Sequence, residues 1–200
     1  MLRKGIALIA VAAFATGCSS EQPAPTSFDI TTPLYVKGGN GDINIGTHLR
    51  GDEEVLAVAA GAPHPSDSHA QGQATFRVTG NSVDFKLIAS NIDNVIMAHI
   101  HCGRFGENGP IRIWLYPVIG TSGSPGPNGS GPHNGVLASG TFSTAGVVCP
   151  AANVGTDMPV LEAMRAGLAY VNVHTNDGVA PTNTGPGDFP GGEIRGQLDK

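Results

Sequence analysis

The feature that most constrains the fold is an alternating segment followed by a glycine-rich turn, within residues 95–117. In an extended chain alternate side chains share a face, so His99 and His101 lie side by side on one face of the segment. Three glycines between residues 103 and 109 permit the backbone angles of a tight connection, and an apolar strand begins at Ile111. The pattern predicts a β-hairpin that carries two neighbouring imidazoles.

Similar alternation recurs along the chain. Residues 74–79 and 83–87 alternate apolar and polar side chains around a Gly-Asn turn, and residues 91–94 turn toward the histidine strand, which predicts a three-stranded meander. The 29 glycines and 15 prolines among 200 residues favour short strands joined by turns. We predict an all-β fold, an antiparallel Greek-key or immunoglobulin-like sandwich. The alternation assigns these side chains to its core: Phe76, Val78, Val83, Phe85, Leu87, Ile96, Ile100, Ile113, Leu137, Val171 and Val173.

One short helix is expected as an insertion in this fold, over residues 159–166. Asp157 precedes it and can accept hydrogen bonds from the free amides of its first turn. Pro159 suits an early helical position, and Gly167 suits the left-handed residue that ends a helix. From residue 120 to residue 135 the chain is rich in glycine, serine and proline, which predicts a long exposed loop.

The central stretch resembles the signature of the CHRD (chordin) domain family, in which Ala-His-Ile-His is followed by glycines and then Asn-Gly-Pro. The resemblance covers residues 47–200. It implies a β domain, and it implies a binding module, because animal chordin is a secreted antagonist of growth factors. The matching blocks, in order, are residues 49–55, 98–101, 108–110, 163–175 and 192–198.

The first 17 residues have the layout of a secretory signal: Arg3 and Lys4, an apolar run over residues 6–14, and small residues before Cys18. The apolar run is too short to span a membrane. Residues 15–18, Ala-Thr-Gly-Cys, resemble a bacterial lipobox, which implies that Cys18 is lipidated and becomes the mature N-terminus. The alternative is cleavage by the ordinary signal peptidase, which leaves Cys18 as a free thiol.

Residues 18–46 read as a tether from the lipid to the domain, with an early edge strand near its end. The leader predicts an exported protein, lipid-anchored in the cell envelope. Ser19 stands where an aspartate would resemble an inner-membrane retention signal, which favours the outer membrane in a cell with two membranes. The expected partners are the membrane, through the lipid, and an unidentified protein or envelope ligand. Nucleic acid is excluded because the net charge is -5 and the basic residues are scattered.

The three cysteines are expected to have two different roles, one for Cys18 and another for the remaining pair. If Cys18 carries the lipid, Cys102 and Cys149 remain as an even pair in an oxidising compartment, where a disulfide is the default. The alternative is two buried free thiols. No Cys-x-x-Cys motif supports a catalytic thiol.

A third histidine belongs beside the first two. His174 ends a predicted strand, residues 169–174, that also presents Tyr170 and Asn172 on its face. Three imidazoles can hold copper or zinc when partners fix their second nitrogens. The alternative is a neutral hydrogen-bonded network without a metal. The candidate ligands are His99, His101 and His174, and the candidate orienting residues are Asn172, Glu193 and Arg195.

The same histidines also resemble the pattern of copper/zinc superoxide dismutases. Those enzymes have a His-x-His strand, a glycine-rich turn, a Gly-Pro-His-Asn-like segment, a strand ending in histidine and a late arginine. Here residues 131–134, His174 and Arg195 follow in that order. The resemblance implies redox chemistry at copper. The gap from His101 to His133 is longer than in those enzymes, and no histidine-rich cluster ending in aspartate follows.

No catalytic residues are assigned. The sequence has no Gly-x-Ser-x-Gly elbow, no phosphate-binding glycine loop followed by Lys and Ser or Thr, and no His-Glu-x-x-His helix. The leading interpretation is a non-catalytic envelope or extracellular binding or structural module on a lipid anchor. The competing interpretation is a copper- or zinc-binding metalloprotein that uses the histidines, with superoxide-dismutase-like activity as its enzymatic form.

Overall fold

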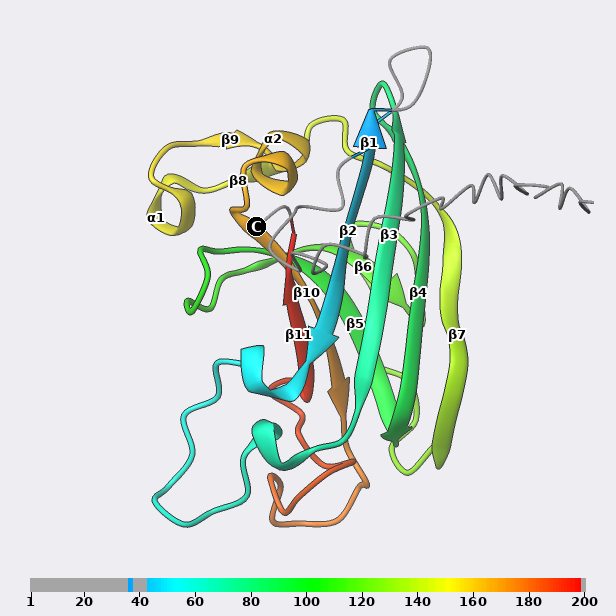
Figure 1. The fold of residues 1–200 in the computed structure, drawn as a ribbon, viewed down its shortest axis with the longest axis vertical. Helices are drawn as coiled ribbons and strands as arrows, with labels where there is room; N and C mark the ends of the chain where they lie inside the picture. The colour runs from blue at the N-terminus through cyan, green and yellow to red at the C-terminus, as the bar shows by residue number, and fades with distance from the viewer. Residues whose placement is uncertain (1–35, 38–42, 199–200) are drawn as a thin grey trace, which may run out of the picture. The chain divides into compact units, whose positions relative to one another are not determined.

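The computed structural model describes residues 36–37 and 43–198. The predicted leader, Cys18 and most of the tether lie outside these residues. Nine antiparallel strands form one large sheet (Figure 1), and β8 (Val148–Cys149) and β9 (Met158–Pro159) form a separate pair. The strands of the large sheet are β1 (Val36–Lys37), β2 (Ile43–Arg50), β3 (Gln71–Thr79), β4 (Ser82–Asp93), β5 (Val95–Cys102), β6 (Ile111–Tyr116), β7 (Pro132–Ser143), β10 (Ala169–Thr175) and β11 (Ile194–Gln197).

The strand order is β6-β5-β10-β11-β2-β3-β4-β7, and β1 pairs with β2 off this path. Side chains beyond the end of β6 reach β7, because a Cβ added at Gly140 would lie 2.5 Å from the Cδ1 atom of Ile119. The sheet therefore curls until its two ends approach one another, as a nearly closed barrel. This arrangement confirms the all-β, antiparallel prediction.

The predicted three-stranded meander is wrong. β3 and β4 do pair as the expected hairpin, but β4 pairs on its other side with β7, and β5 pairs with β6 and β10. Asn91, within β4, and Asn94, between β4 and β5, both have a φ of 54°. The chain therefore crosses to the far end of the strand order before it continues as β5.

The core follows the alternation. Ten of the eleven predicted core side chains are buried, and the exception is Leu137, which is half-buried. Leu137 lies on β7, the last strand of the order, so one of its sides has no ladder partner. Phe76, Phe85 and Phe142 join β3, β4 and β7 through ring centroids 5.8 to 6.3 Å apart.

Two short helices, not one, interrupt the strands: α1 (Ala151–Val154) and α2 (Val160–Arg165). Asp157 Oδ1 accepts a hydrogen bond from the Ala151 amide at 2.7 Å, so it caps α1 and not α2 as expected. Pro159 precedes α2 without a side-chain cap, and Gly167 adopts the expected left-handed conformation, φ 70°. Within the described part of the chain, no helix is long and apolar enough to cross a membrane.

A disulfide joins Cys102, at the end of β5, to Cys149 on β8. The Cα atoms are 5.6 Å apart, and both side chains are fully buried. The bond links the histidine strand to the segment that carries both helices. The structure thus contains the predicted pairing and not two free thiols.

Replacing both Cys102 and Cys149 with alanine should lower the free energy of unfolding. A 47-residue separation corresponds to about 4 kcal/mol in the loop-closure model. Urea denaturation of the full chain measures the difference. Cys18→Ala is the matched control and should leave the midpoint unchanged, whereas a double variant as stable as the wild type would contradict the prediction.

Candidate functional site

Three neighbouring strands, β5, β10 and β11, carry polar side chains on the face opposite the apolar core. The register sets them in rows, because Asn172 lies opposite His99 on β5 and opposite Arg195 on β11, and Tyr170 lies opposite His101. We call these residues the polar face. Its members are His99, His101, Tyr170, Asn172, His174, Arg195 and Gln197, and all are buried.

Loops cover the polar face. His101 Nδ1 donates to the Gly109 carbonyl at 2.8 Å, in the loop between β5 and β6. His174 Nδ1 donates to the Pro190 carbonyl at 2.9 Å, in the loop between β10 and β11. Within the second loop, Phe189 is fully buried. Of the predicted exposed loop, residues 120–135, residues 121–131 are exposed almost throughout, whereas residues 132–135 belong to β7.

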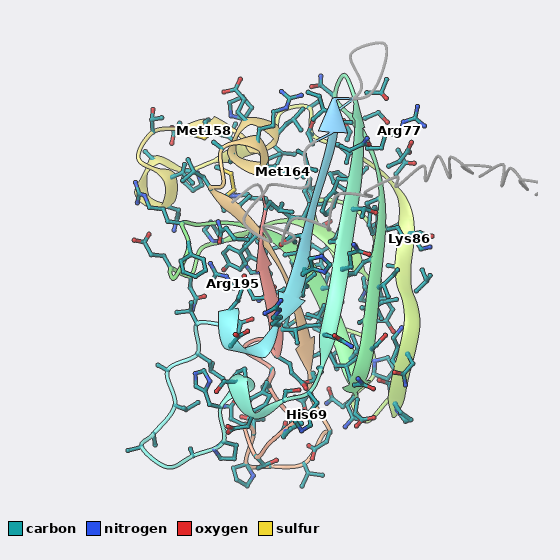
Figure 2. The ribbon with its side chains drawn as sticks, viewed as in Figure 1. His69, Arg77, Lys86, Met158, Met164 and Arg195 are labelled. Carbon is teal, nitrogen blue, oxygen red and sulfur yellow. A yellow bond between two sulfur atoms is a disulfide. The ribbon has the colours of Figure 1, made fainter. Side chains whose placement is uncertain are left out.

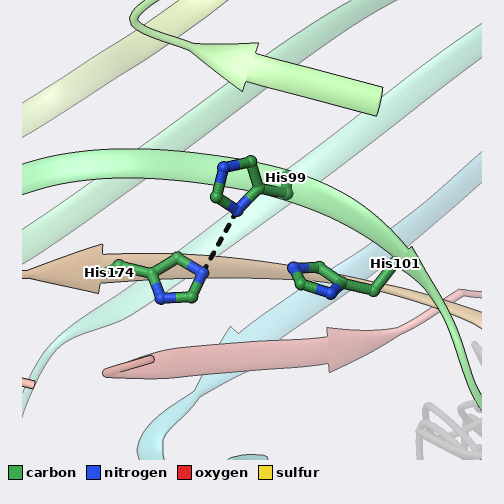
Figure 3. A group of neighbouring side chains, drawn as sticks. All are labelled: His99, His101 and His174. Atoms are coloured by element: carbon green, nitrogen blue, oxygen red, sulfur yellow. Dashed lines mark hydrogen bonds between the residues drawn. The ribbon is translucent and has the colours of Figure 1, made fainter. Parts of the chain in front are cut away.

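The three predicted histidines converge (Figure 3). His99 Nδ1 lies 3.2 Å from His174 Nε2, and one ring nitrogen from each of His99, His101 and His174 lies within 4.8 Å of the other two. Their exposed fractions are 0%, 7% and 5%. We call this group the histidine cluster. It is built by two adjacent strands, with two members from β5 and one from β10.

The hydrogen bonds fix the proton positions on two rings. Because Nδ1 of His101 and of His174 donates to a carbonyl, the Nε2 atom of each neutral ring carries a lone pair. Nε2 of His101 and Nε2 of His99 have no hydrogen-bond partner. His174 Nε2 faces His99 and lies 3.0 Å from Asn172 Oδ1. The acceptors that face the centre of the cluster are therefore Nε2 of His101, Nε2 of His174 and Asn172 Oδ1, whereas Nε2 of His99 points away from the other two rings (Figure 3).

The cluster stays uncharged at neutral pH. Burial, together with the smaller effects of the neighbouring His174 and His101, lowers the pKa of His99 to about 2. Burial likewise lowers the pKa of His101 to about 4 and the pKa of His174 to about 3, although the carbonyls they bind act in the opposite direction. Neutral imidazole is the form that coordinates metal ions.

Of the three predicted orienting residues, Asn172 contacts the cluster directly through His174. Glu193 does not. Its carboxylate accepts hydrogen bonds from Ser68 Oγ, Thr175 Oγ1 and the Gly187 amide, at 2.5, 2.6 and 2.9 Å. Glu193 therefore holds two loops and the end of β10 together, and these hydrogen bonds of its carboxylate go to groups other than the three histidines.

Arg195 reaches the cluster through Tyr170. Its guanidinium lies 3.5 Å from the centroid of the Tyr170 ring, and the His101 ring stacks on Tyr170 at 4.9 Å between centroids and 10° between planes. Arg195, labelled in Figure 2, also donates to the carbonyls of Arg104 and Glu107 at 3.1 and 2.9 Å. It thus fixes the loop that presents the Gly109 carbonyl to His101. Burial lowers the pKa of the Arg195 guanidinium, against the attraction of Tyr170, Glu54 and Glu53.

Sequence reasoning assigned no role to several residues of the site. Alternation placed Tyr170 on the same face as Asn172 and His174, and this position could have identified it as a residue of the site. Trp114, whose ring packs edge-on against His99 at 4.2 Å between centroids, carries no such signal. Nor does Glu54, a nearly buried carboxyl whose pKa is raised by burial. The carbonyls of Gly109 and Pro190 are backbone groups, which no residue pattern identifies.

His133, part of the superoxide-dismutase-like pattern, is not in the cluster. It lies on β7, and its Nε2 atom is 3.4 Å from the Gly135 carbonyl. Among the described residues, the histidines that gather are His99, His101 and His174. The four histidines of the superoxide-dismutase-like pattern therefore do not meet at one site, because His133 lies apart from the other three.

The fold and site define a small antiparallel β domain with a buried polar face closed by loops. The CHRD domain family model matches residues 45–198, and the chain belongs to this family. The match confirms the resemblance carried by the Ala-His-Ile-His and Asn-Gly-Pro motifs, and at the family level it supports a binding or structural module. No curated protein and no solved structure gives a significant match.

The metal-free chain should lose stability as the pH falls below about 6.5, the ordinary histidine pKa. The folded pKa values of the cluster, about 2, 4 and 3, lie below that value, so the unfolded chain binds more protons and acid favours unfolding. Glu54, whose pKa is raised, acts in the opposite direction, but it is one group against three. Urea midpoints at pH 7.5, 6.0 and 5.0 in chelator measure the trend, and a flat profile would contradict it.

Glu193→Gln should lower the free energy of unfolding by about 1–3 kcal/mol, because an amide NH₂ replaces one of two oxygens that face three donors. Glu107→Gln is the matched control. Its side chain is about half exposed, and its backbone carbonyl, which accepts from Arg195, is retained. Equal effects of the two substitutions in urea denaturation would show that the hydrogen bonds of Glu193 add no more to the free energy of unfolding than an exposed carboxylate does.

Proposed function

We propose that this CHRD domain is a non-catalytic binding or structural module carried on a lipid anchor in the cell envelope. The observation that carries the proposal is the family match over residues 45–198. Ahead of that domain, Arg3 and Lys4, the apolar run and Cys18 have the order of a lipoprotein leader.

The contacts of the polar face suit a structural role. The Arg195 guanidinium donates hydrogen bonds to the carbonyls of Arg104 and Glu107. Gln197 Nε2 donates to the carbonyls of Gly103 and Gly167 at 2.9 and 2.8 Å. These side chains are committed to holding loops on the sheet, as buried polar groups usually are. A β domain whose loops are fixed in this way, and closed by a buried disulfide, is a rigid support for a binding surface.

The proposed partners are the membrane, through a lipid on Cys18, and a protein or other envelope ligand on the exposed loops. Residues 121–131 and Val179, which is 64% exposed, offer accessible surface in these loops. The scattered basic residues and the net charge of -5 argue against nucleic acid. In a cell with two membranes, Ser19 after the cysteine favours the outer one.

Cys18→Ala tests the anchor. The wild-type chain, expressed at full length in a bacterial host, should sediment with membranes and carry a lipid-modified mature N-terminus by mass spectrometry. The variant should leave the membrane fraction or accumulate as the unprocessed precursor. Ser20→Ala, which keeps the cysteine, is the matched control and should behave as the wild type.

Normal processing and normal membrane association of Cys18→Ala would overturn the lipid anchor. A wild-type chain found in the cytosol with an intact N-terminus would overturn export. In a host with two membranes, density-gradient separation of the fractions adds the position of the wild-type chain, which we expect in the outer membrane.

A further inference from the structure

We propose that His99, His101 and His174 bind one late first-row transition-metal ion, copper or zinc, which joins β5 to β10 beneath the two covering loops. This inference goes beyond the module function and does not depend on the lipid anchor. It rests on the positions of the ring nitrogens, on the partners of the outward nitrogens and on the acceptor atoms gathered between the rings.

The spacing fits shared coordination. Two nitrogens bound to one tetrahedral zinc at its usual bond length lie about 3.3 Å apart. His99 Nδ1 and His174 Nε2 are 3.2 Å apart, and the third nitrogen lies within 4.8 Å of both. A shift of the His101 ring of up to roughly 1.5 Å, within the reach of side-chain torsions, would complete three ligands at bonding distance.

Two of the three outward nitrogens are already oriented as in metal sites, and the third, Nε2 of His99, has no hydrogen-bond partner. Metal-binding histidines commonly donate the other ring N–H to a carbonyl or carboxylate, which fixes the tautomer and aims the lone pair at the ion. His101 and His174 do this with the carbonyls of Gly109 and Pro190, at 2.8 and 2.9 Å. Both carbonyls come from loops, so the loops themselves set the direction of two ligands.

The acceptors at the centre need a hydrogen-bond donor or a cation as a partner. An Nδ1 proton on His99 could be donated to His174 Nε2, but Nε2 of His101 would still have no hydrogen-bond partner. Asn172 Oδ1 lies 3.0 Å from His174 Nε2, and in this orientation two acceptors face each other. A cation between His174 Nε2 and Asn172 Oδ1 would attract both acceptors, and Asn172 Oδ1 could then serve as a further ligand.

The donor set selects the class of metal. Three imidazoles without a thiolate suit copper and zinc, whereas calcium and magnesium need oxygen ligands. For His99 to bind an ion through Nδ1, its ring proton must lie on Nε2. The edge of Trp114 against His99, at 4.2 Å between centroids, gives the site an apolar wall.

Metal content tests the proposal. The full chain is purified without immobilised-metal chromatography, stripped with chelator and dialysed against copper or zinc in separate arms. We expect one equivalent per chain by elemental analysis in at least one arm. Substitutions His99→Gln, His101→Gln and His174→Gln should each lower bound metal at least tenfold, while His48→Gln, at an exposed position on β2, should keep it.

Spectroscopy of the wild type keeps the test independent of whether the variants fold. In the copper arm, electron paramagnetic resonance should show coupling to several nitrogens. In the zinc arm, X-ray absorption should show about three imidazole ligands. The ion should also slow hydrogen exchange in residues 103–110 and 187–193, because their carbonyls orient the ligands.

Less than a tenth of an equivalent of either metal in the wild type would overturn the proposal. So would equal binding by the folded cluster variants and by His48→Gln, or a spectrum with oxygen ligands alone. In each of these cases the histidines are a hydrogen-bonded network. None of these results bears on membrane association, so the lipid anchor stands or falls separately.

Discussion

The pairing of β10 with β5 is the interaction on which the rest of the structure depends. The two strands are 71 residues apart at their aligned pair Val171 and Ile100, and their register places Asn172 opposite His99. That ladder brings His174 to the two histidines of β5. It also gives β11 its place, because β11 pairs with the other edge of β10 and carries Arg195 to Tyr170. The polar face exists because these three strands lie in this order.

A buried polar face is costly unless each group is satisfied, and here the partners come mostly from loop backbone. Arg195 reaches the carbonyls of Arg104 and Glu107, and Glu193 gathers Ser68, Thr175 and the Gly187 amide. Each of these bonds ties a loop to the sheet. Buried atoms of the face without a hydrogen-bond partner are Nε2 of His99, Nε2 of His101 and Nε of Arg195. The histidine cluster stands out because two of these atoms belong to it.

Sequence patterns predicted the parts of the fold that depend on local geometry. Alternation gave the common face of His99 and His101 and nearly all of the core, because side-chain direction in a strand has a period of two. The exception, Leu137, lies on the terminal strand β7, and a strand's place at the end of a sheet leaves no mark on its own alternation. The prediction that Asp157 caps α2 was also wrong. Both helices begin within a few residues of Asp157, and the sequence does not show that its carboxylate accepts from the first residue of α1.

What the sequence by itself determined is the all-β class, the family, the face on which each strand residue lies and the oxidisable pair Cys102 and Cys149. Tertiary structure alone decided that β4 pairs with β7, that Glu193 binds loops instead of histidines, and that the carbonyls of Gly109 and Pro190 orient two rings. The physical reason is the separation along the chain of the residues that determine each feature. Side-chain direction follows from neighbouring peptide units, whereas strand order and loop placement depend on contacts between residues far apart in the chain, including backbone groups that every residue carries.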